Sequence, residues 1–291
     1  MESGIREDLA ILQKLEGFAA GKIYVQRDDL LHPIISGNKW RKLKGWIRDY
    51  RVKESTTLVT FGGAYSNHLV ATAAAGYLLG IPTIGILRGE EGFNNHYLEL
   101  CRHYGMRLIP VSREVYRDKT GAVALFAPVN SLVVPEGGSG VSAFFGFEDL
   151  INKWNMVPDV IYHASATATT AIGLALKCKE KGWNTRIKAI MVLKNREEQE
   201  LLAQEHGVLD VIDFISDYDF GGYAKCNQSL LAFINSVFLK TKIKLDPVYT
   251  GKAFFGMLQE EEKRPNEMVY FLHTGGELGR LSNKYKDLLL D

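Results

Sequence analysis

Cysteine is scarce in this chain, and its scarcity excludes two kinds of cross-linked architecture. Three cysteines occur among 291 residues, namely Cys101, Cys178 and Cys226, and no two of them form a CxxC pair. An odd number of widely spaced cysteines is typical of neither a disulfide framework nor a zinc site. We therefore expect reduced thiols in the protein core, no metal centre, and a cytoplasmic location.

An excess of charge of either sign is absent as well. The chain has 35 basic and 34 acidic side chains, which gives a net charge of +1. Proteins that bind nucleic acid or anionic membranes usually show a basic excess. The balance therefore favours a small molecule as the partner, and it gives no indication of nucleic acid.

A long apolar segment is also missing. The uncharged run 69–87 is divided by Gly80-Ile81-Pro82 into an alanine-rich helix and a β-branched strand, each too short to cross a bilayer. The first eight residues include acidic side chains and no apolar stretch, so we expect no secretion signal. No membrane partner is expected.

The pattern that is present alternates apolar strands with helices. This alternation predicts an α/β fold with a mostly parallel sheet covered by helices on both faces. Because no long linker is visible, we expect two lobes that are interleaved along the chain. Strands are predicted at 57–61, 83–87, 106–111, 131–134, 159–163, 187–193 and 268–272, and helices at 67–79, 96–104, up to about 154, 170–181 and 195–205.

Lys39 follows a Gly37-Asn38 turn at the predicted start of a helix. Backbone N–H groups, the positive end of the helix dipole and partial burial would all lower the pKa of an ammonium group at that position. A neutral amine can form a Schiff base. The other interpretation is that Lys39 and Lys42 are ordinary exposed lysines.

Three strand ends have small or hydroxylated residues where open α/β sheets bind ligands. In the segment 62–68, two glycines allow a ligand to approach the backbone, although helix capping alone would explain Ser66 and Asn67. The loop 165–170 offers hydroxyls and N–H groups to a phosphate. The third end is 273–276. Residue type alone does not mark any of the nearby histidines as catalytic.

Taken together, these segments resemble the family of pyridoxal-phosphate enzymes that includes 1-aminocyclopropane-1-carboxylate deaminase and D-cysteine desulfhydrase. The resemblance implies a tryptophan-synthase-β-like α/β fold with two interleaved, open, twisted, mostly parallel sheets flanked by helices. It also implies a larger cofactor-binding domain, residues 1–50 and 155–291, and a smaller substrate-side domain, residues 51–154. Pyridoxal 5'-phosphate is expected in the cleft between the lobes, with a small amino acid as substrate. We also expect a homodimer. The matching motifs occur in family order at 26–30, 37–39, 62–67, 135–139, 165–170, 246–252 and 273–276.

The resemblance also implies a role for individual residues. Lys39 matches the Schiff-base lysine, with Lys42 as its noncatalytic neighbour, and Ser66 and Tyr249 match the other catalytic positions. A further active-site tyrosine is expected at Tyr218 or Tyr223. The implied cofactor-binding residues are Lys39, Asn67, Ala166, Thr167, Ala168, Thr169, Thr170 and Thr274, and the implied substrate-binding residues are Ser66, Asn67, His68 and Tyr223.

One departure concerns the phosphate loop, which is normally rich in glycine in this family. Here Ala166, Ala168 and Thr169 occupy glycine-like positions. If any of them needed a positive φ, it would cost about 1 kcal/mol or more. Weakened cofactor binding, or a pseudoenzyme that binds a small molecule without catalysis, is therefore an alternative.

Two further choices concern the reaction. The segment 138–143 fits G-x-G-x-x-A after a strand, which would indicate a dinucleotide-binding oxidoreductase. Within the resembling family, Thr250 and Thr274 favour a D-cysteine desulfhydrase-like β-elimination to a keto acid, ammonia and sulfide over a 1-aminocyclopropane-1-carboxylate deaminase. A hydroxyl near the pyridine nitrogen gives a weaker electron sink than a carboxylate would, and thiolate is a good leaving group.

Overall fold

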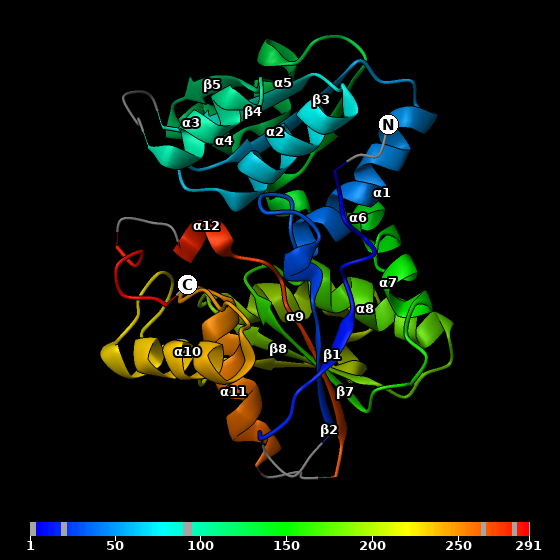
Figure 1. Cartoon of the computed structure of the whole chain (residues 1–291). Coiled ribbons are helices and arrows are strands. Elements are labelled where there is room, and N and C mark those ends of the chain that lie inside the picture. Colours follow the sequence, from blue (N-terminus) through cyan, green and yellow to red (C-terminus); the bar gives the residue numbers. More distant parts are fainter. Residues whose placement is uncertain (1–3, 19–21, 90–94, 263–265, 281–283, 291) are drawn as a thin grey trace. The chain divides into compact units, whose positions relative to one another are not determined.

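The computed structural model describes residues 4–18, 22–89, 95–262, 266–280 and 284–290 (Figure 1). The chain divides into two compact units. The smaller unit contains Lys39–Gly146 with Gly4 and Ile5, and the larger unit contains Arg6–Asn38 and the chain from Phe147 onward. The units are thus interleaved along the sequence, but both boundaries fall earlier than the expected 50/51 and 154/155.

The smaller unit has a four-stranded sheet in which all strand pairs are parallel. On one face, Phe61 and Ile84 pack against Tyr116 and Ala122, and on the other face Leu69 lies against Gly62 and Gly85. Both faces are therefore buried, as a parallel sheet requires. In sheet order the strands are β5 (Arg107–Val111), β4 (Thr83–Arg88), β3 (Thr57–Gly62) and β6 (Ser131–Val134). In chain order the helices between these strands are α2 (Asn67–Leu79), α3 (His96–His103), α4 (Arg113–Arg117) and α5 (Lys119–Phe126).

Helix α1 (Asn38–Val52) explains why the boundary lies before residue 50. A Cβ atom at Gly45 would overlap the carbonyl of Ser142, and one at Gly146 would overlap the carbonyl of Arg41. These two close approaches pack α1 against the segment 142–146 within the smaller unit. Beyond the 3₁₀ turn η2 (Glu136–Gly138), two short helices, α6 (Val141–Phe145) and α7 (Glu148–Asn152), replace the single helix expected to run to about residue 154.

The larger unit has a six-stranded sheet in which only the pair β1–β2 is antiparallel. Figure 1 shows α10 and α11 together at one side of this sheet. In sheet order the strands are β1 (Leu12–Lys14), β2 (Lys22–Gln26), β10 (Met268–Leu272), β7 (Val160–Ser165), β8 (Arg186–Met191) and β9 (Ile212–Ile215). The helices are η1 (Asp28–Leu30), α8 (Thr169–Glu180), α9 (Arg196–Glu205), η3 (Leu209–Val211), α10 (Gln228–Thr241), α11 (Thr250–Glu261) and α12 (Glu277–Arg280).

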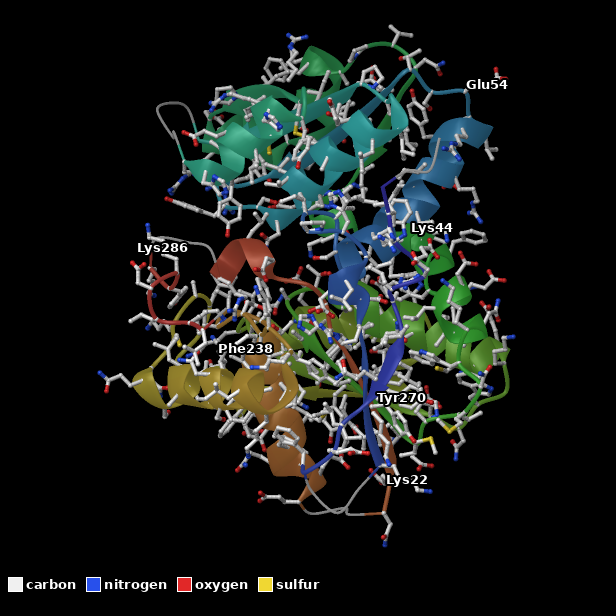
Figure 2. The ribbon with its side chains drawn as sticks, in the orientation of Figure 1. Lys22, Lys44, Glu54, Phe238, Tyr270 and Lys286 are labelled. Atoms are coloured by element: carbon white, nitrogen blue, oxygen red, sulfur yellow. The ribbon has the colours of Figure 1, made fainter. Side chains whose placement is uncertain are left out.

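Alternating residues fill the two faces of the larger sheet. Tyr162 and Phe271 belong to the core that packs against α10 and α11. Tyr270, labelled in Figure 2, is fully buried and makes an edge-to-face contact with Trp154, with ring centroids 5.0 Å apart. Both faces are thus covered, which confirms the predicted α/β class.

The cysteines differ from the expectation at one position. Cys101 and Cys178 are buried, but Cys226 is half-buried because it lies in the surface loop between β9 and α10. Within the described ranges, no helix is long and apolar enough to cross a membrane. The same ranges contain no group of three or more histidine, cysteine or acidic residues arranged to hold a metal ion.

Candidate active site

Each unit has one point at which the strand order reverses. In the smaller sheet the chain runs outward from β3 through β4 to β5, and β6 then pairs on the other side of β3. In the larger sheet it runs outward from β7 to β9, and β10 pairs on the other side of β7. Open α/β sheets bind ligands beyond the carboxyl ends of the strands at such points. Most of the predicted site residues, from Ser66 to His68, from Ala166 to Thr170, and Thr274, follow β3, β7 and β10.

Lys39 and Lys42, which both lie near the start of α1, differ in burial. Lys39 is half-buried in the first turn of α1, whereas Lys42 is buried and its Nζ donates a 3.3 Å hydrogen bond to the carbonyl of Gly137. Burial, together with the nearby charge of Lys39, lowers the pKa of Lys42 well below its usual value. Lys42 is therefore not the exposed helix lysine of the alternative interpretation.

Ser66 and Asn67 begin α2 in different ways. Ser66 is the N-cap residue, and its Oγ accepts a 3.3 Å hydrogen bond from the N–H of Leu69, so the capping interpretation of Ser66 is confirmed. Asn67 Oδ1 is buried and makes no hydrogen bond with any described residue. A buried amide oxygen without a donor is costly. The position of Asn67 is thus suited to a ligand that donates a hydrogen bond.

His68 is buried beside both lysines. Its Nε2 lies 2.9 Å from Oγ1 of Thr60. Burial, with the charges of Lys39 and Lys42, lowers the pKa of His68 to about 3, so the ring is neutral at physiological pH. Thr60 Oγ1 donates its own proton to the carbonyl of Val134, so the neutral ring donates its Nε2–H to Thr60 and has no N–H left for a carboxylate. The part of His68 available to an anion is therefore its backbone at the start of α2.

The loop after β7 has none of the backbone strain that its lack of glycine suggested. None of Ala166, Thr167, Ala168 and Thr169 has a positive φ, and Ala168 is helical with φ −62° and ψ −13°. Ala168 is the N-cap of α8, and no side chain caps this helix. The first N–H groups of a twelve-residue helix are therefore not claimed by a capping side chain, which suits a phosphate.

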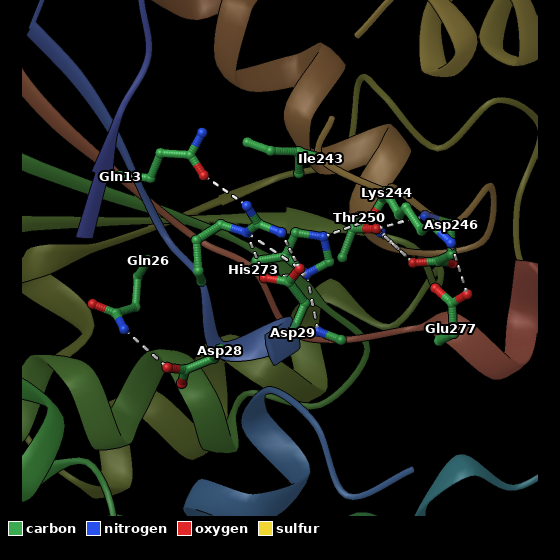
Figure 3. Close-up of polar contacts among 12 residues, drawn as sticks. Gln13, Gln26, Asp28, Asp29, Ile243, Lys244, Asp246, Thr250, His273 and Glu277 are labelled. Atoms are coloured by element: carbon green, nitrogen blue, oxygen red, sulfur yellow. Dashed lines mark hydrogen bonds and ion pairs between the residues drawn. The ribbon is translucent and has the colours of Figure 1, made fainter. Parts of the chain in front are cut away.

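The loop after β10 is fixed by its own histidine (Figure 3). His273 Nε2 lies 2.8 Å from the carbonyl of Lys244, and Nδ1 accepts a 3.3 Å hydrogen bond from the N–H of Gly275. A Cβ at Gly37 would overlap the backbone of Thr274, so Gly37, at φ +61°, allows the two segments to meet. The hydroxyl of Thr274 makes no hydrogen bond with a described residue and its side chain is half-buried.

Asp246 organises the segment that begins α11 (Figure 3). Its Oδ1 accepts hydrogen bonds from the N–H groups of Val248 and Tyr249, and its Oδ2 accepts from the N–H and the hydroxyl of Thr250, all within 2.7–2.9 Å. Thr250 Oγ1 also accepts from the N–H of Asp246 at 2.8 Å. Thr250 is fully buried, and its hydroxyl both donates to Asp246 Oδ2 and accepts from the N–H of Asp246, so this hydroxyl is engaged at the start of α11.

The three tyrosines predicted for the site, Tyr218, Tyr223 and Tyr249, occupy two separate places in the larger unit. The hydroxyl of Tyr249 donates a 3.1 Å hydrogen bond to the hydroxyl of Tyr223. Tyr218 instead packs against Gly256, and its hydroxyl donates a 2.8 Å hydrogen bond to Glu260. Burial and Glu260 raise the pKa of Tyr218 to about 12. Of the two candidates, Tyr223 is therefore the one that lies beside Tyr249.

The segment 138–143 does not have the geometry of a dinucleotide fingerprint. The carbonyl of Gly138 accepts a 3.3 Å hydrogen bond from Trp46 Nε1, and a Cβ at Gly140 would come within 3.0 Å of the same indole. The helix that follows, α6, has five residues. The glycines thus allow α1 to pack closely, and a pyrophosphate would lack the long helix N-terminus it requires.

Comparisons with known proteins identify a matching family model and several relatives of this chain. The family model described as pyridoxal-phosphate dependent enzyme matches residues 8–275. A putative 1-aminocyclopropane-1-carboxylate deaminase of Pyrococcus abyssi is 31% identical, over 87% of this chain and 84% of that protein. A D-cysteine desulfhydrase of Yersinia enterocolitica is 29% identical, over 91% of this chain and 89% of that protein. The crystal structure of an ACC deaminase homologue superimposes with a TM-score of 0.77 at 27% identity and covers 98% of this chain and 96% of its own.

Proposed function

Because the chain belongs to the family of pyridoxal-phosphate-dependent enzymes, we propose that it is a lyase that releases sulfide, ammonia and a keto acid from D-cysteine. Pyridoxal phosphate, when bound, supplies the electron sink for the carbanion that such an elimination requires. The protein supplies the groups that bind, orient and exchange protons around the reacting atoms.

The residues present fit this cofactor. The uncapped N-terminus of α8 and the hydroxyls of Thr167 and Thr169, which lie 3.4 Å apart, are suited to its phosphate. The buried Oδ1 of Asn67 can accept a hydrogen bond from a ring hydroxyl. The hydroxyl of Thr274 is available to a ring nitrogen. Three separate segments thus offer the donors and acceptors that the phosphate, hydroxyl and nitrogen of pyridoxal phosphate need.

In the proposed reaction Lys39 supplies the amine that holds the cofactor, and its Nζ then takes the proton from the substrate α-carbon. Ser66 and the start of α2 bind the substrate carboxylate, because N–H groups at a helix N-terminus favour an anion. Tyr249 and Tyr223 present two hydroxyls to the substrate side chain. The C–S bond breaks, thiolate leaves, and hydrolysis gives the keto acid and ammonia.

The observation that carries the choice of substrate is the chemistry beside Thr274. Asp29 Oδ1 lies 4.0 Å from His273 Nδ1 in this loop, but the carboxylate of Asp29 is paired with Arg27 at 2.7 Å. A second carboxylate at the loop is that of Asp246, since a Cβ at Gly276 would overlap its Oδ2. That carboxylate already accepts four hydrogen bonds from the start of α11. The group left for a ring nitrogen is the neutral hydroxyl of Thr274, which supports the elimination of a good leaving group over the cleavage of a C–C bond.

The second candidate is a 1-aminocyclopropane-1-carboxylate deaminase, which the 31% identical relative favours. The two candidate activities are distinguished by incubating the purified, cofactor-loaded protein with each amino acid. The products measured are sulfide from D-cysteine and 2-oxobutanoate from the cyclic substrate. We expect sulfide to form faster. Faster formation of 2-oxobutanoate would reverse the choice.

A variant at Lys39 tests the enzyme against the non-catalytic alternative. Borohydride reduction and peptide mapping of the loaded protein should find the pyridoxyl group on Lys39, and Lys39→Ala should lose both this link and turnover. A protein that stays colourless after loading with pyridoxal phosphate, and that carries no pyridoxyl group after reduction, would support a pseudoenzyme.

The same proposal includes a cytoplasmic location and a homodimer. The three free thiols support a reducing compartment. Fractionation of the source cells tests the first point, and sedimentation of the loaded protein tests the second.

A further inference from the structure

Lys252 is a fully buried lysine that donates to two backbone carbonyls. It lies in the first turn of α11, and its Nζ is 2.7 Å from the carbonyl oxygen of Asp219 and 2.8 Å from that of Gly222. Burial lowers its pKa, while the charge of Asp219 acts in the opposite direction. Burying an ammonium group is costly unless polar groups compensate it. The two carbonyls that accept hydrogen bonds from this ammonium group belong to one loop.

That loop, residues 216–227 between β9 and α10, has an unusual backbone. Phe220, Gly221, Gly222 and Ala224 all have positive φ, at 51°, 92°, 113° and 55°. Phenylalanine and alanine adopt such a conformation at a cost in energy. The loop therefore depends on contacts from outside itself. Lys252 supplies two hydrogen bonds from a fully buried side chain, and buried Tyr285 supplies a third, at 3.0 Å to the carbonyl of Ala224.

The 216–227 loop includes Tyr223, one of the residues proposed for the site. Tyr223 follows directly after Gly222, and its hydroxyl accepts the hydrogen bond from Tyr249. The two rings also meet edge to face, with centroids 6.0 Å apart and an interplanar angle of 67°. Tyr223 is 49% exposed, so little other than this contact and the backbone of the loop fixes its position.

We propose that Lys252 is a positioning residue that anchors the 216–227 loop and thereby keeps the hydroxyl of Tyr223 against Tyr249. Tyr249 and Lys252 lie three residues apart at the start of the same helix, so one element holds both members of the tyrosine pair. The consequence for turnover rests on the function proposed above, whereas the anchoring of the loop does not.

Cys226 provides a probe of the anchor that is independent of activity. It lies in the same loop and is half-buried, whereas Cys101 and Cys178 are buried and their thiol pKa values are raised by burial to about 12. A thiol reagent should therefore report on Cys226 alone. In Lys252→Met the loss of two hydrogen bonds from a charged group should speed this labelling on the order of tenfold or more, because the loop opens more often.

The direction of the change in labelling rate distinguishes opening of the loop from an electrostatic effect on the Cys226 thiol. Burial raises the pKa of the Cys226 thiol, and the charges of Lys252 and Lys284 lower it. Removing either charge therefore reduces the thiolate fraction and slows labelling at a fixed pH. Lys284→Met is the matched control, since exposed Lys284 makes one hydrogen bond to this loop, at the carbonyl of Ala224. It should label at the wild-type rate or more slowly.

Turnover tests the link to Tyr223. With cofactor-loaded enzyme, Lys252→Met should lower kcat to about the level of Tyr223→Phe, and the double variant should show no further loss, because both changes remove the same positioned hydroxyl. Lys252→Arg, which restores a charged donor, should recover part of the rate. Additive losses would overturn the link.

Other outcomes are equally decisive. Unchanged or slower labelling of Cys226 in Lys252→Met would overturn the anchor. If that variant fails to fold, hydrogen exchange of the wild type decides: the amides of Gly222 and Lys225, bonded to the carbonyls of Asp219 and Gly222, should be protected, and rapid exchange would contradict the anchor. Wild-type holoenzyme inactive on D-cysteine would overturn the proposed function and leave the labelling result standing.

Discussion

The side-chain amide of Asn38 donates a 3.1 Å hydrogen bond to Oγ1 of Thr170, a residue 132 positions later in the chain. Asn38 directly precedes Lys39, and Thr170 lies in the first turn of α8 after the phosphate loop. Both residues are buried. This contact ties the residue next to the candidate Schiff-base lysine to the helix that we propose binds the phosphate.

A double-mutant cycle should detect coupling between Asn38 and Thr170 in the binding of pyridoxal phosphate. Asn38→Ala and Thr170→Val should each weaken binding of pyridoxal phosphate, and the two effects should be non-additive by about 0.5–1.5 kcal/mol, the net value of one hydrogen bond. Absorbance titration of the four proteins gives the affinities. Strictly additive effects would mean that the contact does not couple the two segments.

Ser66→Ala should separate capping from catalysis. The change removes an N-cap and should lower the free energy of unfolding by about 1 kcal/mol. If Ser66 also binds the substrate, turnover should fall roughly 10²–10³-fold while cofactor occupancy stays near that of the wild type.

Ser112→Ala is the matched control for this comparison. Ser112 caps α4 of the same unit in the same way, since its Oγ accepts a 3.2 Å hydrogen bond from the N–H of Val115. It should lose similar stability and keep its turnover. Equal activity of the two variants would reduce Ser66 to a helix cap.

The alternating pattern of the sequence predicted all four strands of the smaller sheet and β7, β8 and β10 of the larger one, because strands buried on both faces are apolar and their helices begin and end at caps such as Ser66 and Gly80. Strands β1, β2 and β9 of the larger sheet were missed, since their three to five residues show no clear period. The boundary before α1 was missed because a helix sequence does not show which unit its glycines contact.

The candidate site was only partly predictable for a similar reason. Hydroxyls and glycines at strand ends are visible in a sequence, so Ser66 and Thr274 could be named. The roles of Asp246, Thr250 and Lys252 depend on hydrogen bonds formed only in the folded chain. The motif 246–252 was a signal for them, but composition does not show which of its polar groups face inward.

Ala168→Gly tests whether the glycine-poor loop is a defect. Ala168 already has helical φ and ψ, so glycine relieves no strain there and adds conformational freedom to the unfolded chain. The substitution should lower the free energy of unfolding by about 0.4–1 kcal/mol and should not tighten the binding of pyridoxal phosphate. Denaturant unfolding and absorbance titration measure the two quantities, and tighter binding in the glycine variant would show that alanine strains the loop.

Lys42 should make the stability of the apoprotein depend on pH. Burial and the charge of Lys39 lower its pKa in the folded state, whereas the unfolded chain has a pKa near 10.5. Between these two values the unfolded state binds more protons, so the free energy of unfolding rises with pH through this window. Below the folded pKa the whole cost of burying the charge is present.

Lys42→Met removes that cost together with one hydrogen bond to Gly137. The difference in free energy of unfolding between the variant and the wild type should therefore be most favourable to the variant at neutral pH. It should shrink as the pH rises toward 10.5, by about 1.4 kcal/mol for each unit by which folding lowers the pKa. Denaturant unfolding of both apoproteins from pH 7 to 10 measures this difference. Exposed Lys53→Met is the control and should show a difference that is flat with pH. A flat difference for Lys42→Met would mean that this amine is charged in the folded protein at little cost, which would contradict the lowered pKa of Lys42.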